Sequence, residues 1–208
     1  MLKGSIYRVT QRNMEVSRLA VSQMYVRSFA EITTAIQDRR MARITLFRHG
    51  KAEEPTQQLA DFDRGLTSRG IANARKMGEF LRDQHMLPDL VLVSTANRTR
   101  QTHASASATW HDIPTEFVDG IYEATASALL LLVAERAANV KNVLILGHNP
   151  SLVVLLNHMV GFDNADSNLS YFPTCCVADV GFADPTLGTI NPEDGRLLSM
   201  MRVRDLPH

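Results

Sequence analysis

Three short apolar runs, each followed by polar residues and a helix-like segment, constrain the fold more than any other feature of the chain. The runs lie within Arg43–Arg48, Leu90–Ser94 and Asn142–Gly147. Apolar and polar residues do not alternate in them, which is typical of strands that are buried on both faces. Strands that alternate with helices favour a mostly parallel sheet between two helical layers. The sequence therefore predicts an α/β fold, a three-layer α/β/α sandwich.

Other elements follow from capping, periodicity and composition. The stretch "LTSRG" predicts a helix start with Thr67 or Ser68 as the N-cap, and this helix runs to about Gln84. No helix separates the last two predicted strands, so we expect an antiparallel edge there. The remaining expected elements are helices over about 98–109, from about Ser127 and after Pro150, and strands over 115–119, 174–182 and 196–203.

Composition argues against several classes of partner. The 208 residues include 22 basic and 22 acidic side chains, so the formal net charge is zero. Nothing therefore indicates bulk attraction to nucleic acid or to an acidic membrane surface, and we expect neither as a partner. The longest strongly apolar run, Ala128–Ala134, is too short to span a bilayer. The oligomeric state stays open.

The two cysteines, Cys175 and Cys176, are adjacent in the chain. Neighbouring residues of an extended strand point to opposite faces, so a disulfide between these two would be strained. We interpret both as buried strand residues. Because no disulfide framework is indicated, we expect a cytoplasmic protein.

The first forty residues differ from the rest of the chain. Apolar residues at helical spacing predict one amphipathic helix over about Glu15–Gln37, and the basic bias of this segment weakly resembles a transit peptide. An alternative is that Met41 is the natural start, since a strand follows it at once. We therefore divide the chain into an N-terminal extension, residues 1–41, and a main domain, residues 42–208.

Polar residues of an unusual kind follow each of the three buried strands. Arg48-His49-Gly50 ends the first strand, Arg98 opens the helix after the second, and His148 lies just past the third. The carboxyl ends of parallel strands share one rim of a sheet, where ligands bind in such folds. One His or Arg at such a place is usually structural or solvated, but three similar placements indicate one shared site.

The residue types at these strand ends indicate phosphoryl chemistry. Two arginines, Arg48 and Arg98, together with two helix N-termini form a site for a phosphate-sized anion. A neutral imidazole is a good nucleophile toward phosphorus, and His49 is the candidate. Gly50 permits close approach of the backbone, and His148 is placed to donate to an oxygen as charge develops.

Six stretches, taken in order, resemble the histidine phosphatase superfamily, which has a phosphoglycerate mutase-like fold. They are "LFRHGKAE", "FDRGLTSRG", "LVLVSTANRTRQT", "IYEAT", "LILGHNPSL" and "RVRDLP". The closer likeness is to the short bacterial branch of SixA-type phosphohistidine phosphatases, and it covers about Ala42–Pro207. The resemblance implies that residues 42–208 form a histidine phosphatase domain.

The resemblance also implies roles for single residues. It implies that His49 becomes phosphorylated and that water then hydrolyses the bond between the phosphoryl group and His49. It also implies that no metal or organic cofactor is needed. Thr95 stands where the family usually has proline, which we expect to change the turn and not the charge. The implied phosphate-binding residues are Arg48, Arg98 and His148, with Gly50 and Asn149 as further candidates.

The general acid is the least determined part of the predicted site. Larger relatives use a carboxylate to protonate an alkoxide leaving group, and Glu123 in "IYEAT" is the candidate by position; a solvated loop carboxylate is the alternative. The SixA-type branch is known for a reduced or absent acid. A reduced or absent acid is sufficient for a phosphoramidate substrate, because imidazole is a far less basic leaving group than an alkoxide and needs less protonation to depart. The rim candidates are Lys51, Asp61, Asp63 and Arg64, although salt-linked loop contacts explain the last three equally well.

We predict a phosphatase that acts through a phosphohistidine intermediate, with phosphohistidine in a protein as its substrate. The stretch between Asp112 and Thr125 leaves no room for a large lid domain, and an open rim suits a protein substrate. Two alternatives stay open: a phosphatase for small phosphomonoesters, and a non-catalytic scaffold that binds phosphate. The presence of all four pocket residues argues against the scaffold.

Overall fold

The computed structural model of the chain describes residues 41–161, 169 and 171–207. The predicted amphipathic helix over Glu15–Gln37 lies outside the described residues, and so does nearly all of the predicted extension 1–41. Both stay predictions. Met41 immediately precedes the first strand.

One six-stranded sheet forms the centre of the domain, with the strand order β3-β2-β4-β1-β5-β6. β3, β2, β4 and β1 pair in parallel, whereas β5 pairs antiparallel with β1 and β6 antiparallel with β5. The predicted parallel sheet with an antiparallel edge is therefore confirmed. The strand bounds are β1 Ala42–Arg48, β2 Leu90–Ser94, β3 Thr115–Val118, β4 Asn142–Gly147, β5 Val177–Phe182 and β6 Arg196–Met201.

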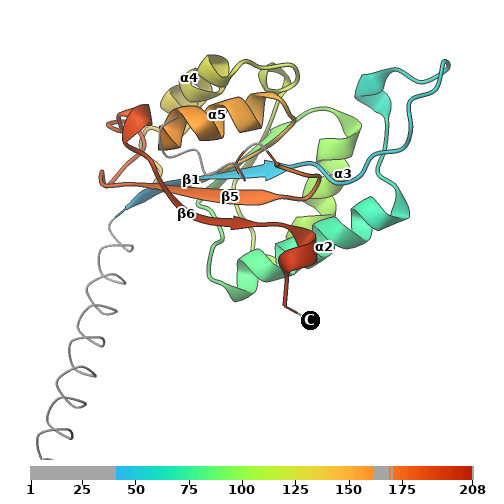
Figure 1. Ribbon diagram of the computed structural model, residues 1–208, viewed down its shortest axis with the longest axis horizontal. Helices are drawn as coiled ribbons and strands as arrows, with labels where there is room; N and C mark the ends of the chain where they lie inside the picture. Colours follow the sequence, from blue (N-terminus) through green and yellow to red (C-terminus); the bar gives the residue numbers. More distant parts are fainter. Residues whose placement is uncertain (1–40, 162–168, 170, 208) are drawn as a thin grey trace, which may run out of the picture. The chain divides into compact units, whose positions relative to one another are not determined.

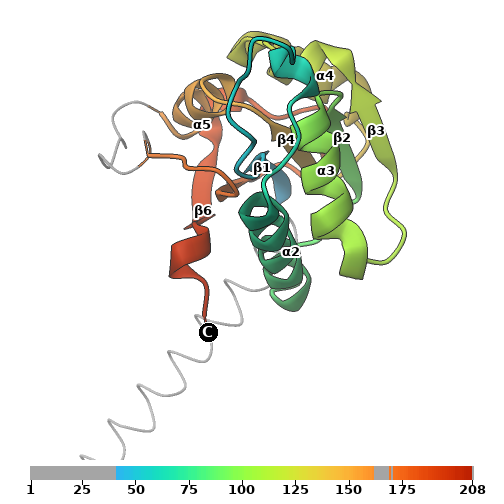
Figure 2. The same ribbon diagram turned by 90° about the vertical axis from the view of Figure 1, so that its right-hand side faces the viewer.

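Helices cover both faces of this sheet and complete the predicted three layers. α2 (Ser68–Asp83) and α3 (Asn97–Ala106) lie on one face, and α4 (Ala126–Arg136) and α5 (Ser151–Val160) lie on the other (Figures 1 and 2). Successive residues of β2 therefore enter opposite cores: Leu92 packs with the α4 and α5 side, and Val93 with the α2 and α3 side. Burial on both faces explains why the strand runs are continuously apolar.

Local side-chain chemistry sets two of the helix starts. The hydroxyl of Thr67 accepts the backbone N–H of Gly70, which confirms Thr67 as the N-cap of α2. In the same way, Thr125 caps α4 by accepting the N–H of Ala128. α3 is shorter than predicted, because its last turn, Ser107–Thr109, is a 3-10 helix.

The start of β5 differs from the sequence prediction. The strand begins at Val177 and not near residue 174, so the two cysteines precede it. Cys175 adopts a left-handed conformation (φ 60°), and its N–H donates to the carbonyls of Arg48 and His49 in place of a regular ladder. Both thiols are free and buried, and they pack into the cores on opposite sides of the sheet. Burial was predicted correctly, but the strand assignment of the pair was wrong.

The last predicted strand is also shorter than expected. β6 ends at Met201, and a 3-10 turn over Val203–Asp205 follows it. Among the described residues, no helix is both long and apolar enough to cross a membrane.

Candidate active site

The parallel strands β2, β4 and β1 are neighbours in the sheet, so their carboxyl ends lie side by side. The structure brings His49, which follows β1, next to His148, which follows β4: their ring centroids are 5.1 Å apart. Arg98 is in the first turn of α3, immediately after β2, and its side chain is 7% exposed. Three separate strand ends thus contribute to one buried cluster.

The ring of His49 is held in a defined tautomer. Its Nδ1 lies 2.7 Å from the carbonyl oxygen of Gly50, and because a carbonyl only accepts, Nδ1 carries the proton. Nε2 is then the nitrogen with a free lone pair. Burial lowers the pKa of His49 to about 4, and the nearby cations Arg98 and Arg48 also lower it. The ring is therefore neutral at pH 7, as a nucleophile requires.

His148 is neutral for similar reasons. Burial lowers its pKa to about 3, with further lowering by His49 and Arg98. Its Nε2 lies 2.9 Å from the hydroxyl of Ser94, at the end of β2. Its Nδ1 is buried and has no hydrogen-bond partner among the described residues. One ring nitrogen thus has a protein partner, and the other is a buried polar group whose hydrogen bond is unmade within the described residues.

The two arginines of the cluster are only partly satisfied by protein groups. Nη1 of Arg48 donates to the carbonyl of Phe172 at 2.8 Å, and Arg98 donates to the 3-10 turn that begins at Asp61. The Nε groups of both arginines are buried and have no partner among the described residues. Asn149 also donates its amide to the Phe172 carbonyl, at 3.0 Å. Buried donors without partners suit a site that binds an anion.

Gly50 is required by packing against α2. A Cβ atom at Gly50 would lie 2.9 Å from the carbonyl oxygen of Gly70, and one at Gly70 would lie 2.3 Å from that of Lys51. The N–H of Gly50 donates to the hydroxyl of Thr102 at 2.9 Å, which in turn donates to the carbonyl of Arg98 at 2.6 Å. The turn that carries His49 is therefore held against α2 and α3.

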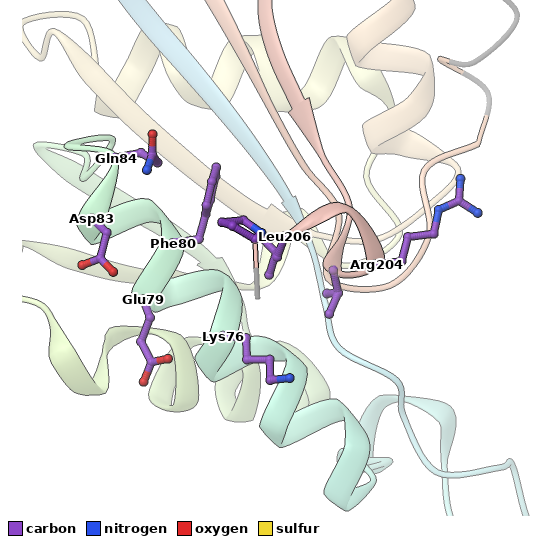
Figure 3. Close-up of a pocket in the computed structure, with 9 residues that line it drawn as sticks. Lys76, Glu79, Phe80, Asp83, Gln84, Arg204 and Leu206 are labelled. Atoms are coloured by element: carbon purple, nitrogen blue, oxygen red, sulfur yellow. The ribbon is translucent and has the colours of Figure 1, made fainter.

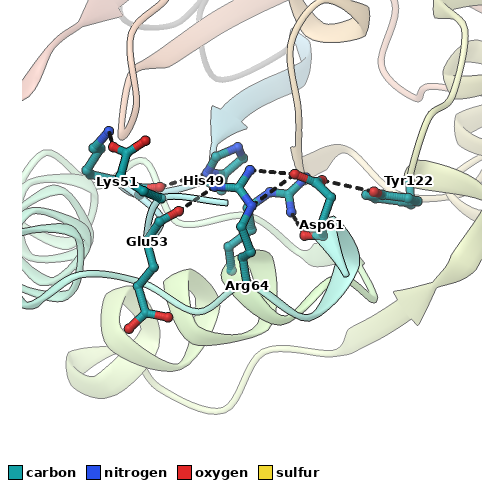
Figure 4. A network of polar contacts seen from close by, with 9 residues as sticks. His49, Lys51, Glu53, Asp61, Arg64 and Tyr122 are labelled. Atoms are coloured by element: carbon teal, nitrogen blue, oxygen red, sulfur yellow. Dashed lines mark hydrogen bonds and ion pairs between the residues drawn. The ribbon is translucent and has the colours of Figure 1, made fainter. Parts of the chain in front are cut away.

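Asp61 lies at the rim and binds three side chains from different segments (Figure 4). Its Oδ2 accepts from Nη2 of Arg98 and from the hydroxyl of Tyr122, each at 3.0 Å, and its Oδ1 accepts from Nε of Arg64 at 2.9 Å. These donors, Arg64 foremost, lower the pKa of Asp61 to about 2. The carboxylate is ionised at neutral pH.

The other rim candidates have looser surroundings. Lys51 pairs with Glu54 at 2.8 Å in an exposed position. Asp63 is exposed, and its carbonyl accepts from Asn97 of α3 at 3.0 Å. Thr95, in the usual place of proline, donates its hydroxyl to Asp119 at 2.6 Å and so joins the turn after β2 to the end of β3.

Glu123 is not brought into the cluster in this structure. Its side chain is exposed, its backbone is left-handed (φ 57°), and the side chain makes no hydrogen bond or ion pair with the described residues. The preceding residue, Tyr122, points inward instead: its ring lies 5.4 Å from that of His148. The acid role of Glu123 stays a prediction.

Comparison with known proteins agrees with this geometry. Residues 44–129 match the model of the histidine phosphatase superfamily (branch 1). An uncharacterised protein of Mycobacterium tuberculosis is 35% identical over 136 residues, which represent 63% of this chain and 84% of that protein. The chain belongs to the histidine phosphatase superfamily.

Solved structures place this histidine phosphatase in the SixA branch. A candidate phosphohistidine phosphatase SixA from Agrobacterium tumefaciens is similar, with a TM-score of 0.68 and 31% identity over 77% of this chain and 97% of that one. A second candidate SixA, from Nakamurella multipartitia, gives a TM-score of 0.66 and 25% identity over 78% of this chain and 96% of that one. The expected family and its fold are confirmed.

The described part of the phosphatase contains no group of three or more His, Cys, Asp or Glu side chains that could hold a metal ion. A cavity of about 430 Å³ lies elsewhere, between α2 and residues 203–207 (Figure 3). None of the predicted site residues lines it.

Sequence reasoning missed four residues that shape the histidine phosphatase site. Ser94 and Thr102 lie within the quoted stretch "STANRTRQT", Tyr122 within "IYEAT", and Gly70 at the end of "LTSRG". Their positions inside these motifs were the available signal. Their roles depend on partners between 19 and 61 residues away in sequence, such as His148 for Ser94 and Asp61 for Tyr122.

Proposed function

We propose that this phosphatase hydrolyses phosphohistidine in a protein substrate, through a covalent phosphohistidine at His49. One observation carries the proposal: the Nδ1–H of His49 is bound to the Gly50 carbonyl at 2.7 Å. This contact orients a neutral ring with Nε2 free, beside two arginines and a second neutral histidine. Such an arrangement suits nucleophilic attack on a phosphoryl group whose oxygens are held by cations.

The reaction takes place in two steps. The lone pair on Nε2 of His49 forms a bond to phosphorus, and the bond from phosphorus to the leaving group breaks with its electron pair on that group. Arg48 and Arg98 hold the phosphoryl oxygens, and His148 donates to one of them. A water oxygen then forms a bond to phosphorus, and the P–Nε2 bond breaks with its electron pair on Nε2. Inorganic phosphate leaves with both hydrogens of that water, and His49 keeps its proton on Nδ1.

The open rim supports a protein as the substrate. The chain passes from β3 through a 3-10 turn, Asp119–Ile121, and reaches α4 at Ala126, so only a few residues lie beyond this strand end. No helical lid is inserted between these elements. A phosphorylated side chain that projects from another protein can therefore approach the strand ends. The similarity to SixA structures supports the same substrate class.

The test compares three substrates with wild-type protein and with the His49→Ala variant. The substrates are a histidine-phosphorylated protein, a phosphoserine peptide and free phosphoserine. We expect wild type to release phosphate from the histidine-phosphorylated protein at least tenfold faster than from either ester, and His49→Ala to lose this activity. Faster hydrolysis of free phosphoserine would favour the alternative of a small-monoester phosphatase. Equal rates for wild type and His49→Ala would favour the non-catalytic scaffold.

The acid role of Glu123 has a separate test. A general acid contributes about 10²-fold or more to ester hydrolysis. Because Glu123 is exposed and phosphohistidine needs little acid assistance, we propose that Glu123→Gln changes the phosphohistidine rate by less than about twofold. The expected cytoplasmic location stays a prediction.

A further inference from the structure

Asp61 is a charged rim residue that the two-step mechanism does not use. Its carboxylate binds Arg98, Arg64 and Tyr122, and its backbone carbonyl accepts from Nη1 of Arg98 at 2.6 Å. Its side chain is nevertheless 52% exposed, whereas Arg98 is buried. Asp61 therefore connects a buried arginine of the cluster with the solvent-exposed surface.

The surroundings of Asp61 make it a permanent anion and a poor proton donor. Two arginines and a tyrosine hydroxyl donate to it, so a proton is held only in strong acid. An ester needs the opposite, because its alkoxide leaving group must receive a proton at the bridging oxygen. Asp61 in this state cannot supply that proton at neutral pH.

A phosphohistidine leaving group has a different requirement. Its reactive form is protonated on the ring nitrogen remote from phosphorus. When the P–N bond breaks, the electron pair moves onto the ring, which leaves as neutral imidazole and keeps its proton on the remote nitrogen. An anion or carbonyl that accepts this remote N–H stabilises the reactive form, and no proton has to be transferred to the bridging atom.

The phosphohistidine proposed at His49 would have this arrangement. When His49 is phosphorylated on Nε2, its remote nitrogen is Nδ1, and the Nδ1–H is held by the Gly50 carbonyl. The substrate imidazole lies on the opposite side of the phosphoryl group and needs an acceptor of its own. Beside Asp61, the rings of Phe62 and Tyr122 meet edge to face with centroids 5.0 Å apart, and these apolar surfaces suit a flat heterocycle.

We propose that Asp61 accepts a hydrogen bond from the remote N–H of the departing imidazole, and thereby selects nitrogen-linked over oxygen-linked phosphoryl groups. This inference rests on the proposed function and names a residue that determines its substrate class. Oδ1 of Asp61 accepts from both Nε and Nη2 of Arg64, and Oδ2 accepts from Arg98 and Tyr122. The substrate N–H therefore takes the place of the neutral Tyr122 hydroxyl, while the two arginines fix the carboxylate.

The experiment uses two small probes, phosphoimidazole and para-nitrophenyl phosphate. The aryl ester has a leaving group that needs little acid assistance. The measured quantity is the ratio of kcat/KM for phosphoimidazole to kcat/KM for the aryl ester, because any change in how Arg98 binds phosphate affects both substrates and cancels. We expect Asp61→Asn to lower this ratio about tenfold or more, as expected for loss of a hydrogen bond to a charged group.

Asp63→Asn is the matched control. It removes a carboxylate from the same 3-10 turn, Asp61–Asp63, and the side chain of Asp63 makes no hydrogen bond or ion pair with the described residues. We expect this control to keep the ratio within about twofold of wild type. Asp61→Glu keeps the charge, so we expect it to lower this ratio of kcat/KM values less than Asp61→Asn does. Should Asp61→Asn not fold, Asp61→Ala gives the same comparison.

The possible outcomes separate the two proposals. An unchanged ratio in Asp61→Asn, or an equal loss toward both probes, overturns the role of Asp61 while wild type still cleaves phosphoimidazole. A wild-type protein that cleaves the aryl ester and not phosphoimidazole overturns the proposed function, and the role of Asp61 with it. A selective loss toward phosphoimidazole, absent from Asp63→Asn, supports the inference.

Discussion

The hydroxyl of Ser94 lies 2.9 Å from Nε2 of His148, and both side chains are buried. Nδ1 of His148, in contrast, has no partner among the described residues. The ring is neutral, so only one of its nitrogens carries a proton. Because phosphoryl oxygens accept hydrogen bonds, we expect the Ser94 hydroxyl to donate to Nε2, which leaves the proton on Nδ1 for the substrate.

Replacing Ser94 with alanine tests this tautomer assignment. We expect Ser94→Ala to lower kcat about tenfold, because a lost hydrogen bond of roughly 1–1.5 kcal/mol leaves the ring free to adopt the wrong tautomer. Steady-state kinetics on phosphoimidazole measure the change. Ser105→Ala is the control, since within the described part of the chain that hydroxyl bonds only to the carbonyl of Gln101 in the same helix. Equal kcat values for Ser94→Ala and Ser105→Ala would contradict the assignment.

The low pKa values of the two histidines predict how the free protein titrates. The pKa of His49 is lowered to about 4 and that of His148 to about 3. Ring resonances of both residues are therefore expected to stay in the neutral state as the pH falls from 8 to 5. A histidine NMR titration measures this directly, with His49→Gln and His148→Gln to assign the signals. A midpoint near 6.5 for either residue would contradict the burial argument.

The same shift predicts a loss of stability in acid. An unfolded histidine binds its proton at a pKa of about 6.5, above the folded value, so the unfolded state gains protons first. The contribution of His49 to stability is complete above about pH 6.5 and is lost as the pH falls toward its folded pKa of about 4. We expect a loss of about 3 kcal/mol in the free energy of unfolding from this group. Urea unfolding across this range should show a shallower fall for His49→Gln than for wild type.

Packing between α2 and the turn that carries His49 gives a prediction about glycine. A Cβ atom at Gly70 would lie 2.3 Å from the carbonyl oxygen of Lys51, so one of the two backbones must move. We expect Gly70→Ala to lower the free energy of unfolding by about 1–3 kcal/mol and to reduce activity by displacing the turn that carries His49. Gly120→Ala is the control, because nothing lies within 4 Å of the corresponding Cβ. Equal stability and activity of the two variants in urea unfolding and kinetic assays would contradict this interpretation.

The strands that carry the site could be predicted closely from the sequence. β2 and β4 have the predicted bounds, because strands buried on both faces require uninterrupted apolar residues. These apolar runs also predicted that His49, Arg98 and His148 follow strand ends at one rim, because the carboxyl ends of parallel strands share a rim. The start of β5 was missed because the N–H of Cys175 donates to the backbone carbonyls of Arg48 and His49, a long-range contact with no local signal.

The role of Asp61 could not be derived from sequence for a related reason. Asp61 belongs to a short 3-10 turn in an irregular segment, and its partners Arg98 and Tyr122 are 37 and 61 residues further along the chain. Hydrophobic periodicity carries no information about such a segment. The sequence indicated only that a carboxylate was near the rim, and Glu123 was the candidate for the acid because it follows a predicted strand end.

The most direct test of the account is to trap the phosphorylated protein. Phosphoimidazole labelled with radioactive phosphate is mixed with the wild-type chain and quenched in alkali within milliseconds, and the labelled peptide is identified by mass spectrometry. The account predicts an acid-labile, alkali-stable phosphoryl group on His49 that disappears as phosphate is released, and no label in His49→Ala. Label on another residue, or turnover without any label on His49, would contradict it.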